Sequence, residues 1–469
     1  MAGHDIRTDA AEPVFDAFSG MSQSLHWEAL PERTRTNLRR ELLDYFGAAV
    51  AGRKAAGMPA WLQVLIDMGG RPDARVVGGP GVPAPLAALC NGYFGHVLEF
   101  DDTHDEAVLH AGAAVIPAAL AAAGLRGAVS GREFCEAVLL GIELTCRLGV
   151  ATRLNLVEGG WIYTALLGHF GATLAAARLL DADPKVWRNA LGIVYCLASG
   201  NHQSTREGAP TKHVQPGFAA SNAVTAAMMA ARGLQGVGQP LSGEDGLARV
   251  YLRGQFDAAR ALRDLGVAWE ADRLSIKPYP TCRLTHPAIS ATLELRERLG
   301  DRLTQVERVE LLMGEQACDV VGRGAPEKRV PQTRINAQFS AHWSAASALA
   351  YGEVTPLQLA SDIPPSAALA AWIARVECRA VPSGDARDVG GCKVRAIGPF
   401  GTVEVEHKSA KGHPDHPVTD DELLAKFLAN LSYAGVADGR ARELADAILT
   451  IDRLPDVRVL ADALAGAAV

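Results

Sequence analysis

The first 265 residues of the chain carry apolar side chains at helical spacing. The clearest segments repeat apolar residues every three or four positions and end at glycine, serine or a polar turn; they are 34–52, 131–149, 164–180, 184–199 and 216–232. This periodicity is typical of amphipathic helices that bury one face. A further helix is expected at 58–69 and a short extended piece at 74–77. The pattern predicts a large, mainly helical domain over residues 1–269.

The pattern changes near residue 273, where alternation replaces the helical spacing. Residues 305–312 and 374–380 alternate like strands, and 392–397 with 402–407 predict a hairpin around GPFG. Helices are expected between these strands at 336–351 and 355–361. A capping-box sequence, TDDE at 419–422, then opens a helix through residue 431. We therefore expect a mainly α protein with an α+β domain over residues 270–410 and C-terminal helices over 411–469.

Composition narrows the functional classes. The 469 residues carry a net charge of −7 and contain 48% hydrophobic residues, which is typical of a globular protein. The chain lacks the basic stripe that nucleic-acid binding requires. Its eight cysteines are scattered without a CxxC pair, and its first 20 residues have no apolar core, so a reducing cytoplasm is expected. The uncharged run at 107–125 is alanine-rich and contains Pro117, which favours a buried helix over a membrane span.

The segment EFDDTHDEAVLH, from Glu99 to His110, lies between two apolar stretches and concentrates ionisable side chains. They are Glu99, Asp101, Asp102, His104, Asp105, Glu106 and His110. Carboxylates at the edge of an apolar wall have shifted pKa values and often form functional sites. The alternative is a solvated acidic loop between two helices.

Two of the nine lysines stand in unusual settings. Lys212 lies in GAPTKHVQPG, where a glycine- and proline-rich loop runs into a helix, and Lys277 lies in SIKPYPTCRLTHP. These loops also contain His213, Arg283 and His286. Each lysine could be an ordinary surface charge. Cationic loops that face an acid/base cluster would nevertheless suit a small polycarboxylate substrate.

A metal-dependent alternative comes from DDTHD at 101–105, which matches the DDxxD pattern that class I terpene synthases use to bind Mg²⁺. Those enzymes require a second metal motif with an N, S and E spacing. The nearest candidate, Asn201, Ser204 and Glu207, has the wrong spacing. The low aromatic content of 6% also suits a carbocation pocket poorly. No metal and no other cofactor is therefore expected.

The chain resembles the MmgE/PrpD family, which includes 2-methylcitrate dehydratase, cis-aconitate decarboxylase and iminodisuccinate epimerase. The matching segments, in order, are LLDYFGAAVAG (42–52), ALCNGYFGHVLEFDDTH (88–104), HAGAAVIPAALAAA (110–123), LGHFGATLAAARLL (167–180), TKHVQPGFAASNAVTAAMMAARGLQG (211–236), KPYPTCRLTHPAI (277–289), AQFSAHWSAASALAYGEV (337–354) and Lys426-Phe427. The resemblance implies a helical domain built from both chain ends, an inserted α+β lid, a homodimer and metal-free chemistry in a cleft.

The resemblance also implies roles for single residues. His110 occupies the position of a proposed general acid/base, and Glu99 stands where an Asp is common. Asp101, Asp102 and Thr103 match directly, Lys212 and Lys277 match lysines that bind substrate carboxylates, and His286 matches the histidine of a TH pair. Proton abstraction next to a carboxylate builds negative charge, which neighbouring ammonium groups stabilise.

The chain departs from the family pattern at several positions. Ile162 and Gln215 stand where the family has histidines, Trp343 stands where it has a tyrosine, and Ala111 replaces the proline after His110. The departures leave open an altered substrate, a different reaction or a weakened enzyme. Substitute imidazoles could come from His104, His169, His213 or His342.

These features together predict a cofactor-independent lyase or isomerase that acts on a small carboxylate. An elimination like that of 2-methylcitrate dehydratase is the first hypothesis. Decarboxylation or epimerisation of a related acid is the second, and a ligand-binding pseudoenzyme is the alternative from another class. The expected substrate-binding residues are Thr103, His104, Ile162, His213, Gln215, Lys277, Arg283, His286 and Trp343, beside the expected catalytic residues Glu99, Asp101, Asp102, His110 and Lys212.

Overall fold

Helices dominate the computed structural model, which describes residues 12–180, 183–323, 326–361, 363–382 and 390–467. This confirms the mainly α class. Up to residue 262 the helices are α1 (Pro13–Ser24), α2 (Glu32–Ala56), α3 (Ala60–Asp67), α4 (Ala84–His96), α5 (Gly112–Arg126), α6 (Gly131–Ala151), α7 (Leu156–Gly159), α8 (Tyr163–Leu166), α9 (Gly168–Leu180), α10 (Pro184–Tyr195), α11 (Gln203–Glu207), α12 (Thr211–Ala230), α13 (Leu247–Val250) and α14 (Ala258–Leu262). A two-stranded sheet pairs β1 (Ala74–Arg75) with β2 (Gly81–Val82).

Small residues let the central helices approach closely. A Cβ added at Gly92 of α4 would lie 2.8 Å from the Cα of Gly217 on α12. A Cβ at Gly141 of α6 would lie 2.6 Å from the carbonyl oxygen of Gly171 on α9. Larger side chains at these crossings would push the backbones apart. The abundance of alanine and glycine in the sequence is therefore the composition that this packing requires.

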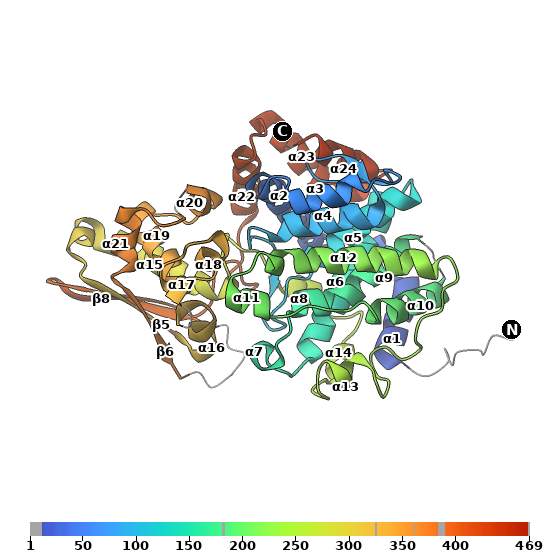
Figure 1. Ribbon diagram of the computed structural model, residues 1–469, viewed down its shortest axis with the longest axis horizontal. Coiled ribbons are helices and arrows are strands. Elements are labelled where there is room, and N and C mark those ends of the chain that lie inside the picture. The colour runs from blue at the N-terminus through green and yellow to red at the C-terminus, as the bar shows by residue number, and fades with distance from the viewer. Residues whose placement is uncertain (1–11, 181–182, 324–325, 362, 383–389, 468–469) are drawn as a thin grey trace.

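The C-terminal helices pack against the N-terminal ones. Figure 1 shows α22 (Asp420–Tyr433), α23 (Asp438–Leu449) and α24 (Arg458–Ala465) in red beside the blue helices α2 to α4. One hydrophobic core contains buried residues from 14 to 276 together with residues from 418 to 467. Helix α22 begins with the predicted capping box, because Thr419 and Glu422 bond reciprocally. Residues from both chain ends thus share one core.

Residues 284–405 form two further cores around a four-stranded sheet. The strand order is β6 (Val376–Val381), β5 (Arg308–Gly314), β7 (Cys392–Gly398) and β8 (Gly401–His407). Strands β5 and β6 are parallel, and the other pairs are antiparallel. The helices here are α15 (His286–Leu299), α16 (Glu315–Ala317), α17 (Pro326–Arg329), α18 (Arg334–Gln338), α19 (Ala341–Tyr351), α20 (Pro356–Ser361) and α21 (Ala367–Ile373). All four predicted strands are present, including the hairpin around GPFG.

Several predicted helix boundaries differ from the structure: the helix predicted at 164–180 divides into α8 and α9, and the one predicted at 184–199 ends at Tyr195. Helix α12 begins at Thr211 rather than at residue 216, because Pro216 lies inside the helix instead of opening it. The predicted helix at 336–351 divides into α18 and α19, since Ser340 caps the second one through its bond to the amide of Trp343. The uncharged run at 107–125 supplies the buried helix α5. Among the described residues, no helix is long and apolar enough to span a membrane.

Candidate active site

The acidic segment lies between the end of α4 and the start of α5. Its centre forms strand β3 (Thr103–His104), which pairs with β4 (Leu274–Ser275). This pairing brings the acidic segment beside the loop that contains Lys277 and Arg283. Glu99 has a positive φ of 51°, a conformation that costs a non-glycine residue about 1 kcal/mol. Burial and ionic contacts hold Glu99 in that conformation.

A cavity of about 90 Å³ opens against this segment. Its polar lining residues are Glu99, Thr103, Asp105, His110, Thr164, His202, Thr205, Lys212, Arg283 and Gln316, and its remaining lining residues are Val108, Ile162, Cys282, Leu284, Val320 and Phe339. The cavity therefore joins residues from the N-terminal helices to residues of the 284–405 region. Five of the predicted site residues other than Glu99 line it, namely Thr103, His110, Ile162, Lys212 and Arg283.

Glu99 is the centre of the ionic contacts in this site. Its side chain is buried, and its Oε1 contacts the ammonium of Lys212. Lys277 donates to the Glu99 carbonyl oxygen at 3.0 Å and lies 3.4 Å from Oε2. The imidazole Nε2 of His213 is 3.4 Å from Oε1. Two buried ammonium groups thus compensate one buried carboxylate, which satisfies the need of a buried charge for partners.

His96, which the sequence analysis did not single out, connects Lys212 to Asp101. Lys212 donates to Nε2 of His96 at 2.7 Å, and Nδ1 of His96 lies 2.8 Å from Oδ2 of Asp101. Burial and the Lys212 charge lower the pKa of His96 well below its usual value. Burial and the Lys277 charge likewise lower the pKa of Lys212. The sequence did contain a cue for His96, because this histidine stands three residues before Glu99 at the end of a helix, where the two side chains can lie close together.

His110 faces the cavity with a neutral ring. Its Nδ1 is 2.5 Å from the carbonyl oxygen of Asp102; because a carbonyl only accepts, Nδ1 carries the proton and Nε2 keeps its lone pair. Burial, with a further effect from Lys277, lowers the pKa of His110 to about 3. The backbone amide of His110 donates to Thr164 Oγ1 at 3.1 Å. A neutral, oriented imidazole at a cavity wall can act as a general base.

The carboxylates of the DDTHD segment point in different directions. Asp101 faces His96, whereas Asp102 accepts the amides of Ala111 and Gly112 at 2.8 and 3.1 Å. Asp105 receives two bonds of 2.9 Å from the guanidinium of Arg283. Burial and the Asp101 charge raise the pKa of Asp102 to about 8, while Arg283 keeps the pKa of Asp105 below its usual value against the effect of burial. The three carboxylates therefore do not converge on a common point as DDxxD ligands must.

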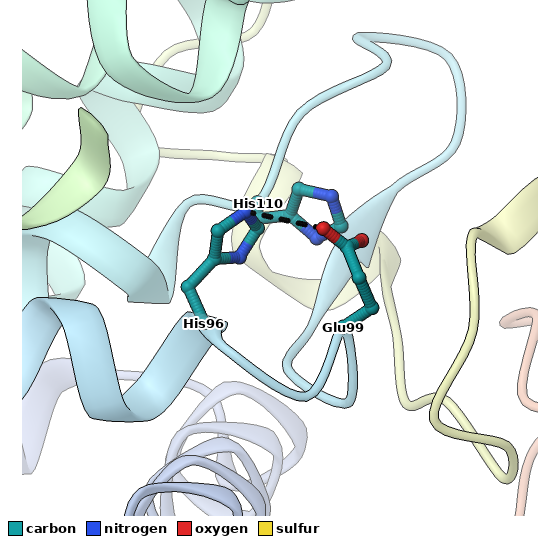
Figure 2. Close-up of side chains that lie close together, drawn as sticks. All are labelled: His96, Glu99 and His110. Atoms are coloured by element: carbon teal, nitrogen blue, oxygen red, sulfur yellow. Dashed lines mark ion pairs between the residues drawn. The ribbon is translucent and has the colours of Figure 1, made fainter. Parts of the chain in front are cut away.

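Another group with metal-ligating side chains is His96, Glu99 and His110, whose ligand atoms lie within 4.8 Å of one another. Figure 2 shows these three side chains facing each other, with the ion pair between His96 and Glu99 dashed. The Lys212 ammonium contacts both Nε2 of His96 and Oε1 of Glu99. The positive charge among these side chains is thus a lysine, and the cluster does not fit a metal ion.

Several predicted site residues lie outside the cavity wall. His104 turns to Glu270, with Nε2 3.1 Å from the carboxylate. His286 bonds to the Thr281 carbonyl oxygen, and Trp343 is fully buried in the core around α19. Gln215 bonds to the backbone of Asn201 and to Ser204 Oγ, and so fixes the turn before α11. Because these residues do not line the cavity, they can affect a bound ligand only by positioning residues that do.

An imidazole lies in the same wall as Ile162, but it comes from an unexpected residue. His202 lines the cavity, and its amide donates to the carbonyl oxygen of Gly160 at 2.9 Å. Burial lowers the pKa of His202 to about 4. Of the four histidines proposed as substitutes, His169 bonds to the Ala165 carbonyl oxygen of α8 and to Asn222, and His342 lies near Cys378. Sequence spacing carried no signal for His202, because the turn before α11 was not predicted.

Comparison with known proteins places both parts of the chain in one family. The profile described as the MmgE/PrpD N-terminal domain matches residues 16–259, and that described as the MmgE/PrpD C-terminal domain matches residues 279–451. Together the two matches cover most of the chain, including the acidic segment and the loop that contains Lys212, while Lys277 lies just before the second match.

Curated relatives carry one activity in their names. A cis-aconitate decarboxylase-like protein of Aspergillus oryzae is 28% identical over 402 residues, 81% of this chain and 82% of its own. The cis-aconitate decarboxylase of Aspergillus terreus is 24% identical over 477 residues, 96% of each chain. The cis-aconitate decarboxylase of Homo sapiens is 26% identical over 298 residues, 61% of this chain and 60% of its own.

Proposed function

The chain belongs to the MmgE/PrpD family, and from that premise we propose that it is a cofactor-independent lyase that decarboxylates a small unsaturated carboxylate. The observation that carries the proposal is the pairing of a neutral imidazole, His110, with a buried ammonium, Lys212, on one cavity wall. The relatives named as decarboxylases favour decarboxylation over the methylcitrate-type elimination of our first hypothesis.

In the proposed reaction the bond between a carboxylate carbon and its neighbour breaks, and the electron pair stays on the neighbouring carbon. Lys212 stabilises that charge and supplies the proton that the carbon needs, since a lowered pKa makes its ammonium a stronger acid. When the departing group binds as a carboxylic acid, His110 takes the carboxyl proton through Nε2, so that the group leaves as CO₂ and the proton stays on the imidazole. Arg283, held by Asp105, orients a second anionic group of the substrate.

The charge and polarity of the cavity favour a substrate with an apolar substituent. Two cations in the wall, Lys212 and Arg283, are balanced by Glu99 and Asp105. Ile162, in place of a histidine, extends an apolar surface with Leu284, Val320 and Phe339. An aconitate-type acid with an alkyl substituent fits both the cations and this apolar surface.

The test is an assay of the purified protein against cis-aconitate, an alkyl-substituted aconitate, methylcitrate, citrate and iminodisuccinate, with CO₂ release and proton NMR as readouts. We expect CO₂ from an aconitate-type acid. Water elimination from methylcitrate without CO₂ would support the dehydratase instead. If none of the five acids were turned over and none produced a thermal shift, a carboxylate lyase would be contradicted. Light scattering on the same preparation tests the proposed homodimer.

A further inference from the structure

A buried carboxyl group that the proposed reaction does not use lies behind the acidic segment. Glu41 is on α2 and is only 4% exposed. Neither of its carboxylate oxygens has a hydrogen-bond partner in the described part of the chain. A fully ionised carboxylate is not stable in such a place. Glu41 must therefore hold or share a proton.

Asp102 is the partner that the geometry provides. A Cβ added at Gly112 would lie 2.6 Å from Oε1 of Glu41 and 2.9 Å from Oδ1 of Asp102. The two oxygens thus flank the same glycine, and its missing side chain leaves room for both. Asp102 already accepts two backbone amides at the start of α5 through its own oxygens. This arrangement favours the anion on Asp102 and the proton on Glu41.

The charges around the pair favour one shared proton. Besides Asp102, the carboxylates of Asp44 and Asp101 face Glu41 and the Lys426 ammonium opposes them. Burial is the largest cause of the raised pKa of Glu41, and the Asp102 charge is the next. Asp44 is itself bonded to Lys426 at 2.5 Å, so that lysine compensates Asp44 first. One proton on the Glu41–Asp102 pair removes the remaining repulsion.

Asp102 links this pair to the reacting wall. Its carbonyl oxygen accepts the Nδ1 proton of His110, and its carboxylate fixes the amides of Ala111 and Gly112 that follow His110. A displacement of Asp102 would move the His110 ring. On its other side Glu41 lines a second cavity of about 420 Å³ that reaches the exposed residues Arg33 and Asp420. Protons can therefore exchange between the pair and solvent without passing the substrate cavity.

We propose that Glu41 is a positioning residue that shares one proton with Asp102 and thereby holds His110 in its working orientation. Loss of that proton at alkaline pH leaves two like charges beside Gly112, which push Asp102 and the first turn of α5 apart. The proposal rests on the proposed function for its effect on turnover. Its effect on folding stability is independent of any substrate.

The test compares Glu41→Gln with Glu41→Ala, and uses Glu32→Gln as the matched control on the exposed start of the same helix. The glutamine amide donates a hydrogen bond to Asp102 but cannot lose its proton. We therefore expect Glu41→Gln to keep kcat within about twofold at pH 7 and to remove the decline in melting temperature with rising pH that the proposal predicts for wild type. Glu41→Ala should lower kcat about 10-fold with little change in KM.

Each outcome decides the proposal. A decline in melting temperature with rising pH that persists in Glu41→Gln overturns it, as does a Glu41→Ala enzyme with unchanged kcat. If wild type turns over no carboxylate, the proposed function fails on its own account. In that case the melting-temperature profiles still test the shared proton. Infrared spectroscopy tests it too, because wild type should show a carboxylic-acid band at neutral pH that is lost in Glu41→Gln and kept in Glu32→Gln. Absence of that band in wild type overturns the shared proton.

Discussion

Lys212 donates a hydrogen bond to Nε2 of His96 at 2.7 Å, and this contact fixes the tautomer of the ring. An ammonium cannot accept, so Nε2 must be the unprotonated nitrogen and Nδ1 must carry the proton that is donated to Asp101. Two consecutive hydrogen bonds thereby connect the Asp101 carboxylate, the His96 imidazole and the Lys212 ammonium. The Lys212 ammonium, at one end of these two hydrogen bonds, lines the cavity.

Removing the imidazole of His110 tests its role as the oriented base. We expect His110→Ala to lower kcat about 100-fold or more, because general acid/base catalysis contributes on that order. The melting temperature should stay close to that of wild type. His26→Ala, which removes an exposed imidazole, is the control. A His110→Ala enzyme with wild-type turnover would exclude the role.

Removing the ammonium of Lys212 should destabilise the fold as well as stop turnover. Glu99 would lose one of its two ammonium contacts and keep only Lys277, and breaking a buried pair costs about 3 kcal/mol. In the double variant Lys212→Met/Glu99→Gln we expect part of the stability to return while activity stays absent. Urea unfolding measures the stability of the single and the double variant, and CO₂ release measures their activity.

The control for that experiment is Lys393→Met, which breaks an exposed pair with Glu406 and should cost less than about 1 kcal/mol. A Lys212→Met protein no less stable than Lys393→Met would contradict the buried ion pair. So would a double variant that is less stable than Lys212→Met alone.

The buried neutral histidines predict sensitivity to acid. Burial lowers the pKa values of His110 to about 3 and of His169 to about 4. The folded state then binds fewer protons than the unfolded state below pH 6.5, so stability is present above that pH and is lost as pH falls toward about 4. Each such histidine contributes a slope of up to about 1.4 kcal/mol per pH unit. His169→Gln, away from the cavity, should reduce the slope of unfolding free energy between pH 6.5 and 4.5; an unchanged slope would contradict it.

Replacing Ile162 by His tests the apolar wall. The added imidazole brings a hydrogen-bond donor and hydration into a wall that contains Leu284 and Phe339. We expect kcat/KM for cis-aconitate to rise relative to that for an alkyl-substituted aconitate by about 10-fold. Ile162→Val should leave the ratio close to wild type. The assignment of this wall to the substituent fails if both variants change the ratio equally.

Gly112 lacks a side chain because two carboxyl groups need its space. Gly112→Ala would place its Cβ 2.6 Å from Oε1 of Glu41, and the resulting overpacking should cost about 2 kcal/mol. Gly20→Ala on α1 has no neighbour within 4 Å and should stabilise the protein by about 0.5 kcal/mol. Thermal unfolding distinguishes the two; equal effects would contradict the close approach at Gly112.

Sequence periodicity predicted the elements well where local signals were strong. The capping box at Thr419 and the alternation over 392–407 depend on nearby residues, and both are confirmed. The family resemblance, which comparison confirms, identified Glu99, Lys212 and Lys277 as residues of one site, and they are in contact. His96, His202 and Glu41 were missed because their importance comes from partners distant in sequence. Lys212, for example, lies 116 residues from His96.

The short ladder between Thr103–His104 and Leu274–Ser275 has a consequence for synthesis of the chain. When Glu99 and Asp105 leave the ribosome, the cations that will neutralise them have not been made. Lys212 is translated later, and Lys277 and Arg283 follow only with the second strand of the ladder. The nascent helical region must keep its most acidic stretch hydrated until residue 283 has emerged. A fragment that ends at residue 259 would contain Glu99 and Asp105 but lack Lys277 and Arg283, so these carboxylates would stay incompletely neutralised.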